Sequence, residues 1–164
     1  MGTPSRASEI TQLLAFVDSA FDRRSWHGPN LRGSLRGVTP AQAAWRPAPG
    51  RHNIWELTVH AAYWKYVAVR RLTGAKRGSF DLKGSNWFER TGQPTAAAWR
   101  ADLALLEESH HAFREVVAGL TPRDLSRTLP GAEFNNFGLV SGVAAHDFYH
   151  AGQIQLLKRM MRAR

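Results

Sequence analysis

Four segments of the sequence carry apolar residues at intervals of three and four positions, and none alternates apolar and polar residues as a strand would. We predict helices over about Pro4–Trp26, Asn53–Leu72, Thr95–Leu120 and Gly138–Arg162. A helix with one apolar face buries that face against other helices. The chain is therefore predicted to be an all-α four-helix bundle. Its 164 residues suit one core, so residues 1–164 are expected to form a single domain.

Two of the predicted connections resemble each other: residues 37–50 read GVTPAQAAWRPAPG, and residues 119–131 read GLTPRDLSRTLPG. In each, a threonine is the predicted N-cap, a proline follows it, and a polar residue stands three positions on, as in a capping box. These pairs are Thr39 with Gln42 and Thr121 with Asp124. Thr-Pro is also simply a common way to begin a short helical turn. The shared pattern favours two related halves, which predicts that the second and fourth long helices run parallel.

Three histidines fall on the inward faces of these two helices. His146 and His150 share the apolar stripe of LVSGVAAHDFYHAGQIQLL, and His60 lies on the stripe of the second helix. Residues four apart on a helix lie about 5–6 Å from each other, so this pair can chelate one metal ion. His60 lies about 10 Å from the start of its helix, and His146 and His150 lie about 12–18 Å from the start of theirs. If the two helices are parallel, the three imidazoles therefore lie at a similar height in the bundle. One divalent metal ion would satisfy all three buried imidazoles.

The segments WELTVHAAYW around His60 and GVAAHDFYHAGQIQLL around His146 and His150 resemble the DinB/YfiT-like family of metal-binding four-helix bundles. The loop sequences WRPAPG and SNWF are similar to that family too, and the resemblance covers about Ser8 to the C-terminus. It implies a divalent ion on the three histidines, a homodimer, and kinship with S-transferases that use thiols such as bacillithiol or mycothiol. Imidazole suits several metals, of which zinc or nickel is expected.

Three histidine ligands leave coordination positions open, as in reactive rather than structural sites. Together with the kinship to thiol S-transferases that the resemblance implies, this favours a transferase that joins a low-molecular-weight thiol to a small-molecule substrate. A metal-dependent hydrolase and a non-catalytic metal or small-molecule binding protein are the alternatives. His110 lies on the inner seam of the third helix. If that helix is antiparallel to the second and fourth, His110 reaches the height of the triad, as a second-shell group or a general base. Otherwise it is a core histidine bonded to a neighbour.

Other side chains near the predicted site are open to interpretation. Glu56 could orient His60 or simply complement the dipole of its helix. Gln153 could bond substrate or metal-bound water, whereas Tyr149 is expected to pack. In the long polar loop 75–94, Trp87 and Phe88 either wall a pocket or anchor the loop, which must fold back to reach the metal. The preferred lip of the site is the segment 121–138, with Phe134, Asn135, Asn136 and Phe137.

Composition excludes several classes of protein. The chain has no cysteine, so thiolate metal sites and cysteine nucleophiles are excluded. The net charge of +9 is spread over the predicted helix ends rather than concentrated, so nucleic acid is not an expected partner. No apolar run is long enough to span a membrane, and the N-terminal segment lacks the apolar core of a signal peptide. A cytoplasmic location is expected.

Overall fold

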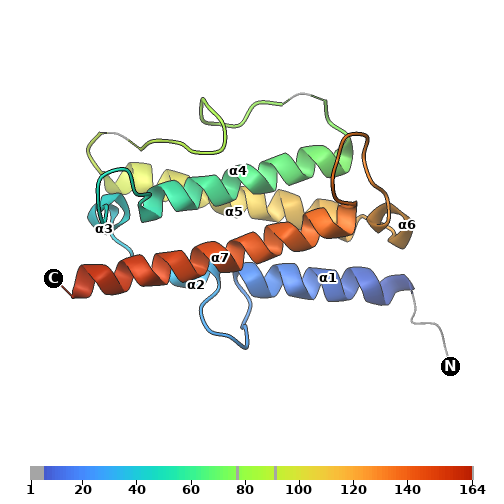
Figure 1. The fold of residues 1–164 in the computed structure, drawn as a ribbon, viewed down its shortest axis with the longest axis horizontal. Helices are drawn as coiled ribbons and strands as arrows, with labels where there is room; N and C mark the ends of the chain where they lie inside the picture. Colours follow the sequence, from blue (N-terminus) through green and yellow to red (C-terminus); the bar gives the residue numbers. More distant parts are fainter. Residues whose placement is uncertain (1–5, 77, 91, 164) are drawn as a thin grey trace.

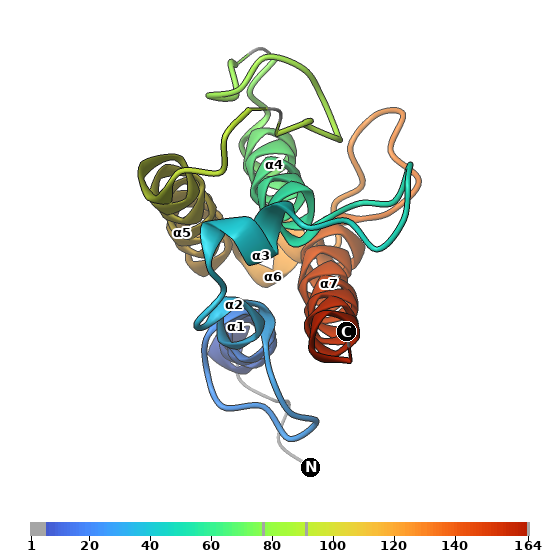
Figure 2. The ribbon, with the colours of Figure 1, turned by 90° about the vertical axis from the view of Figure 1, so that its left-hand side faces the viewer.

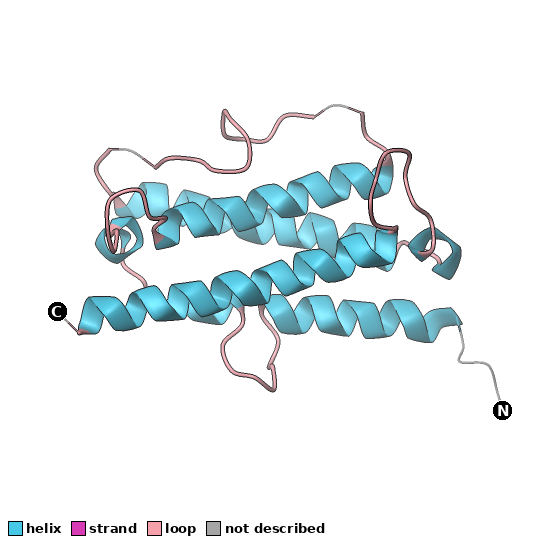
Figure 3. Ribbon diagram, in the orientation of Figure 1, coloured by secondary structure: helices cyan, strands magenta, loops and turns pink. Residues whose placement is uncertain are grey.

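The computed structural model describes residues 6–76, 78–90 and 92–163. Four long helices lie side by side (Figure 1): α1 (Arg6–Phe21), α4 (Ile54–Thr73), α5 (Ala96–Ala118) and α7 (Asn136–Arg162). Three short helices occupy the connections between them: α2 (Leu31–Leu35), α3 (Pro40–Ala44) and α6 (Pro122–Leu125). No strand occurs among the described residues (Figure 3). The predicted all-α four-helix bundle is confirmed.

The predicted helix limits hold to within a few residues except at α1, which was predicted to reach Trp26 and ends at Phe21. Beyond its last turn the hydroxyl of Ser25 donates a hydrogen bond of 2.6 Å to the carbonyl of Ser19. That bond satisfies a terminal carbonyl without a further helical N–H, so the chain can leave the helix. The predicted start at Pro4 lies outside the described residues.

Both Gly-x-Thr-Pro segments begin short helices, as predicted. Thr39 caps α3 and Thr121 caps α6, and each forms a complete capping box with the residue three positions on. Asn53 forms the same kind of box with Glu56 at the start of α4. The helix ends at Gly74, whose φ of 71° is a left-handed conformation that glycine adopts without steric cost. These local signals determine where helices begin and end, but not how they run relative to one another.

Helix α4 runs parallel to α5 and antiparallel to α7, which contradicts the predicted arrangement. Trp55, near the start of α4, donates a hydrogen bond of 2.5 Å to Asp102, near the start of α5. Lys65, later in α4, pairs with Asp147 in the first half of α7. In Figure 1, α4 and α5 both advance away from the end where α7 finishes. The two similar connections are therefore local helix starts and not the mark of two parallel halves.

A parallel pair of neighbouring helices needs a connection that returns along their length. Helix α4 has 20 residues and is about 30 Å long, so the loop after it runs back over the bundle before α5 begins (Figure 1). Phe88 anchors this loop: it is 4% exposed and its ring lies 5.4 Å from that of Tyr63 and 5.2 Å from that of Phe80. Arg90 adds an ion pair of 2.7 Å with Asp102. The loop thus folds back, as the sequence argument required.

Viewed along the bundle, α1, α4, α5 and α7 surround the interior, and α3 lies across one end (Figure 2). Apolar side chains fill this interior in two clusters, one toward the α3 end with Ile54, Leu106 and Ile154, the other with Val17, Phe113 and Val140. The ion pair of Lys65 and Asp147 is buried among them, with side chains 1% and 2% exposed. No helix in the described part of the chain has the length and apolar character needed to cross a membrane.

Candidate metal centre

The three predicted ligand histidines meet in the interior between α4 and α7. His60 comes from the second turn of α4, and His146 and His150 come from successive turns of α7. The Nε2 atom of His146 lies 3.1 Å from Nε2 of His60 and 2.8 Å from Nε2 of His150. One ligand nitrogen from each of the three lies within 4.8 Å of the others. The three side chains could therefore hold one metal ion.

Two of these imidazoles are oriented by hydrogen bonds to their outer nitrogens. Nδ1 of His60 donates to the carbonyl oxygen of Asn86 at 2.7 Å, and Nδ1 of His150 donates to Oε1 of Gln153 at 2.6 Å. With the proton on Nδ1, the lone pair on Nε2 points into the cluster, which is the usual arrangement of metal-binding histidines. Gln153 thus bonds a histidine, an arrangement that the sequence interpretation did not foresee.

Asn86 was not recognised from the sequence. It lies in the crossover loop and has a φ of 63°, the only positive φ of a non-glycine residue among the described ones. Asparagine tolerates this left-handed conformation better than most residues, and such conformations concentrate at functional sites. Its carbonyl reaches His60, while its side-chain oxygen accepts a hydrogen bond of 3.0 Å from Trp64. The only sequence signal was a Gly-Ser-Asn turn beside two aromatic residues.

Trp87 follows Asn86 and covers the cluster from the loop side. Its ring is stacked between His60, at 3.8 Å, and His52, at 3.6 Å, with interplanar angles of 6° and 7°. Each of the two alternatives for the loop aromatics therefore holds for one residue: Trp87 forms a wall beside the histidines, and Phe88 anchors the loop. His52 is exposed, and its ring makes this stacking contact.

Burial keeps the cluster uncharged. It lowers the pKa of His146 to about 3 and that of His150 to about 4, and it lowers the pKa of His60 as well. The nearby charge of Lys65 contributes to the lowering at His146 and His150. All three imidazoles are therefore neutral at pH 7, which is the state in which imidazole binds a metal ion.

The residues fit a divalent ion. Nitrogen ligands about 2.0–2.1 Å from tetrahedral zinc lie about 3.3 Å from each other, close to the two spacings in the cluster. With Nδ1 of His60 and His150 protonated, their Nε2 atoms are both acceptors, and one N–H of His146 can satisfy only one of them. Nδ1 of His146 has no hydrogen-bond partner in the described part of the chain. A cation among the Nε2 atoms would satisfy all three lone pairs at once.

Glu56 does not orient His60, whose Nδ1 is already bonded to the loop carbonyl. The Glu56 carboxylate instead accepts hydrogen bonds from Arg46 at 2.9 Å and from the Asn53 backbone at 3.4 Å, and lies 3.1 Å from Nδ1 of His52. Burial would raise the pKa of Glu56, but the bonds from Arg46 and His52 outweigh it, so the pKa is lowered. Of the two alternatives for Glu56, a role in the first turn of its helix is therefore the correct one, and the orientation of His60 is not.

A cavity of about 570 Å³ lies beside the cluster, and His150, Gln153 and Trp87 form part of its wall. The rest of the wall comes from the segment before α4 and from the second half of α7: Pro47, Ala48, Arg51, His52, Leu57, Tyr149, Leu156, Leu157 and Met160. Tyr149 was expected to pack but is 63% exposed and lines this cavity.

The predicted lip, residues 121–138, does not line this cavity. Phe134 instead lines a separate one together with Arg71, which lies in the last turn of α4. The lip was placed on the assumption that α4 and α7 begin at the same end of the bundle. Because they are antiparallel, the segment that leads into α7 lies at the end where α4 finishes.

His110 lies in the core against α1. Its ring stacks on Phe21 at 3.6 Å with an interplanar angle of 10°, and its Nδ1 has no partner among the described residues. Its height in the bundle was predicted with α5 antiparallel to α4, but the two helices are parallel. Counting from the contact between Trp55 and Asp102, His110 lies about 4–5 Å further along the bundle than His60. Its role as a second-shell group or general base stays a prediction.

The replacement of His110 by leucine should make the metal-free protein less sensitive to acid. Burial, with the charges of Lys65, His111 and Arg114, lowers the pKa of His110 from 6.5 to about 3. Between these values the unfolded chain binds a proton that the folded protein does not. The contribution of neutral His110 to the free energy of unfolding is therefore fully present above pH 6.5. It falls as the pH drops toward 3, by up to about 1.4 kcal/mol per pH unit. Urea denaturation from neutral to mildly acidic pH should show a shallower fall for His110→Leu than for the unchanged protein. Equal slopes for the two proteins would contradict the lowered pKa of His110.

One of three comparisons with known proteins gave a match. A search of curated proteins and a search of solved structures found no match. The sequence model of the DinB superfamily matches residues 23–154, which is well over half of the chain. This stretch includes all three clustered histidines. The helical bundle, the histidine cluster and this match lead to the same conclusion: the chain belongs to the DinB superfamily.

Proposed function

We propose that the protein is a divalent-metal-dependent enzyme that transfers a low-molecular-weight thiol to a small-molecule electrophile. The observation that carries this proposal is the convergence of three neutral Nε2 atoms, two of them with their outer nitrogens held by hydrogen bonds. Zinc or nickel on His60, His146 and His150 is the proposed cofactor. Three protein ligands leave positions open for a reactant.

A divalent ion at this centre would supply a Lewis acid that stabilises a thiolate at neutral pH. The protein contributes orientation and shielding. The carbonyl of Asn86 and the amide of Gln153 hold two imidazoles with their lone pairs turned inward. The stacked ring of Trp87 covers one side of His60 and limits the access of water there. The adjoining cavity has room for a small-molecule substrate.

The distribution of carboxylates favours thiol transfer over hydrolysis, because a metal-dependent hydrolase usually needs a free carboxylate as a general base. No aspartate or glutamate lines the cavity beside the cluster. The three buried carboxylates of the described residues are all engaged: Asp147 with Lys65, Glu56 with Arg46, and Asp102 with Arg90. A non-catalytic binding protein is the remaining alternative.

The test is turnover by the metal-loaded full chain. Thiols such as cysteine and glutathione are offered with 1-chloro-2,4-dinitrobenzene, and activated esters are offered in a parallel hydrolysis assay. We expect thiol-dependent conjugation that disappears after metal removal and in His146→Ala. Ester hydrolysis without conjugation would favour the hydrolase, and metal binding with neither activity would favour the binding protein.

For His110 we propose an indirect role in this site. Its pKa of about 3 makes the imidazole a weak base at neutral pH, which argues against proton abstraction. Instead, His110 stacks on Phe21 and feels the charge of Lys65, so it contacts the part of the core next to the cluster. His110→Ala should keep the metal and lose most of any activity. Full activity in this variant would leave His110 as a core histidine only.

We also propose that the protein is a homodimer, mainly because family resemblance implies it. Trp26 supports the proposal, because its large side chain is fully exposed in the single chain and aromatic residues are enriched in interfaces. Light scattering at micromolar concentration should give twice the chain mass of 18.3 kDa. A single-chain mass under these conditions would refute the dimer.

A further inference from the structure

The cavity beside the histidine cluster has an unusual set of polar groups. Among its lining residues Arg51 is the one permanently charged side chain, and none carries a carboxylate. Within the described part of the chain, the Arg51 guanidinium forms no ion pair and no hydrogen bond. An unpaired arginine beside an apolar surface is well suited to bind a carboxylate or another planar anion.

Two further polar groups of this cavity can also donate hydrogen bonds. Oε1 of Gln153 already accepts from His150, so the amide group that remains is the NH₂. The hydroxyl of Tyr149, on an exposed side chain, makes no hydrogen bond with another described residue. With neutral histidines, a divalent ion in the cluster would keep its full double charge beside this wall. Every one of these features favours a negatively charged ligand.

Apart from His52 and His150, the remaining wall is apolar or aromatic. It comprises Pro47, Ala48, Leu57, Trp87, Leu156, Leu157 and Met160. A volume of about 570 Å³ is typical of sites that enclose small organic molecules. The exposed ring of Tyr149 can pack against a flat apolar ligand, whereas Trp87, stacked between two histidines, offers only its ring edge. The lining therefore suits a molecule with an apolar body and one anionic end.

The geometry points to an organic anion with an aromatic or other apolar body as the ligand class of this cavity, with its anionic group paired to Arg51. The identification of that ligand as a substrate rests on the proposed function. Binding itself depends only on the residues of the cavity and can be measured without any reaction.

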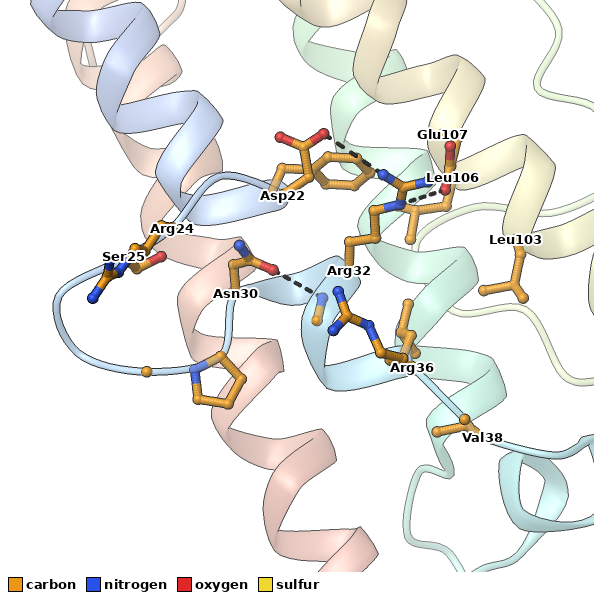
Figure 4. Close-up of a pocket in the computed structure, with 16 residues that line it drawn as sticks. Asp22, Arg24, Ser25, Asn30, Arg32, Arg36, Val38, Leu103, Leu106 and Glu107 are labelled. Atoms are coloured by element: carbon orange, nitrogen blue, oxygen red, sulfur yellow. Dashed lines mark hydrogen bonds and ion pairs between the residues drawn. The ribbon is translucent and has the colours of Figure 1, made fainter.

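A second, larger cavity provides a contrast. It lies between the end of α1, α2 and α5, and its volume is about 840 Å³ (Figure 4). Arg32 there is paired with Glu107 at 2.8 Å and faces Asp22 at 3.9 Å. Acidic side chains thus already balance part of its positive charge. Arg36 lines it and, like Arg51, has no ion pair among the described residues, so Arg36→Met is a matched control for Arg51→Met.

The experiment compares 2-naphthoate with 2-naphthamide, which has the same ring and no charge, by calorimetric titration of the full chain. Both the metal-free and the zinc-loaded protein are titrated. We expect naphthoate to bind about tenfold more tightly than naphthamide in both forms. Arg51→Met should remove this difference and leave naphthamide binding unchanged, whereas Arg36→Met should change neither. Tyr149→Ser should weaken both probes alike.

Several results would overturn the inference. Equal affinities for the two probes, or no saturable binding of either, would exclude an anion site. Loss of the preference in Arg36→Met instead of Arg51→Met would place the anion in the other cavity. A preference that needs zinc and survives Arg51→Met would mean that the carboxylate binds the metal alone, so that this inference fails while the proposed function stands. If the protein binds no metal but binds naphthoate through Arg51, this inference stands while the proposed function fails.

Discussion

His146→Ala is expected to lower the affinity for zinc by more than about 100-fold, a larger loss than the 10–100-fold typical of a hydrogen-bonding partner of a ligand. His146 is the central member of the cluster, since its Nε2 lies within 3.1 Å of Nε2 of each of the other two histidines. Without it two nitrogens remain, too few to hold the ion firmly. Elemental analysis after dialysis and competition with a chromophoric chelator measure the change.

Two matched variants give this result its meaning. His111→Ala removes an exposed histidine of α5 outside the cluster and should keep full metal affinity. Gln153→Leu removes only the hydrogen bond to His150 and should cost an intermediate amount, about 10–100-fold. Thermal unfolding should show that all three variants fold, because the two apolar clusters do not depend on the metal. Undiminished zinc binding by His146→Ala would exclude the centre.

Lys65→Met is expected to reduce the free energy of unfolding by about 3–5 kcal/mol, because it leaves the buried carboxylate of Asp147 without a partner. Both side chains are almost completely inaccessible, so water cannot replace the lost ion pair. The double variant Lys65→Met/Asp147→Leu should recover most of the loss, since an apolar pair of similar volume avoids the cost of burying charge. Urea denaturation at pH 7 measures all three proteins.

The control for this prediction is Arg32→Met, which breaks an exposed ion pair with Glu107. Solvent-exposed ion pairs contribute about 0–1 kcal/mol, so this variant should remain close to the unchanged protein. A loss below about 1 kcal/mol in Lys65→Met would show that Asp147 finds another partner or takes up a proton at little cost.

The histidine cluster could be predicted from the sequence although one premise of the prediction was wrong. His60 and the pair in α7 were assigned the same height on the assumption that α4 and α7 are parallel. They are antiparallel, yet the histidines still meet. The reason is that His146 and His150 lie near the middle of the 27-residue α7, so their height changes little when the helix is reversed. Helix periodicity is a local property that the sequence carries, whereas helix direction depends on long-range packing.

The surroundings of the cluster could not be predicted in the same way. Asn86 and Trp87 reach His60 only because α5 is parallel to α4 and the loop between them must return along the bundle. No periodic pattern marks these positions. The incorrect lip and the incorrect direction of the helix that carries His110 have the same origin, because helix direction does not follow from residue patterns.

The return of the crossover loop also has a consequence for the order of assembly during synthesis. His60 and the carbonyl that orients it are 26 positions apart, whereas His60 and His146 are 86 apart. Domains begin to fold as the chain emerges from the ribosome, N-terminal parts first. Helix α4, its loop and α5 can therefore associate while the last helix is still being made, and His60 is then already oriented. The nascent chain would present one of the three proposed metal ligands, open on the side that α7 later fills, and docking of the final helix would complete the fold and the site in one step.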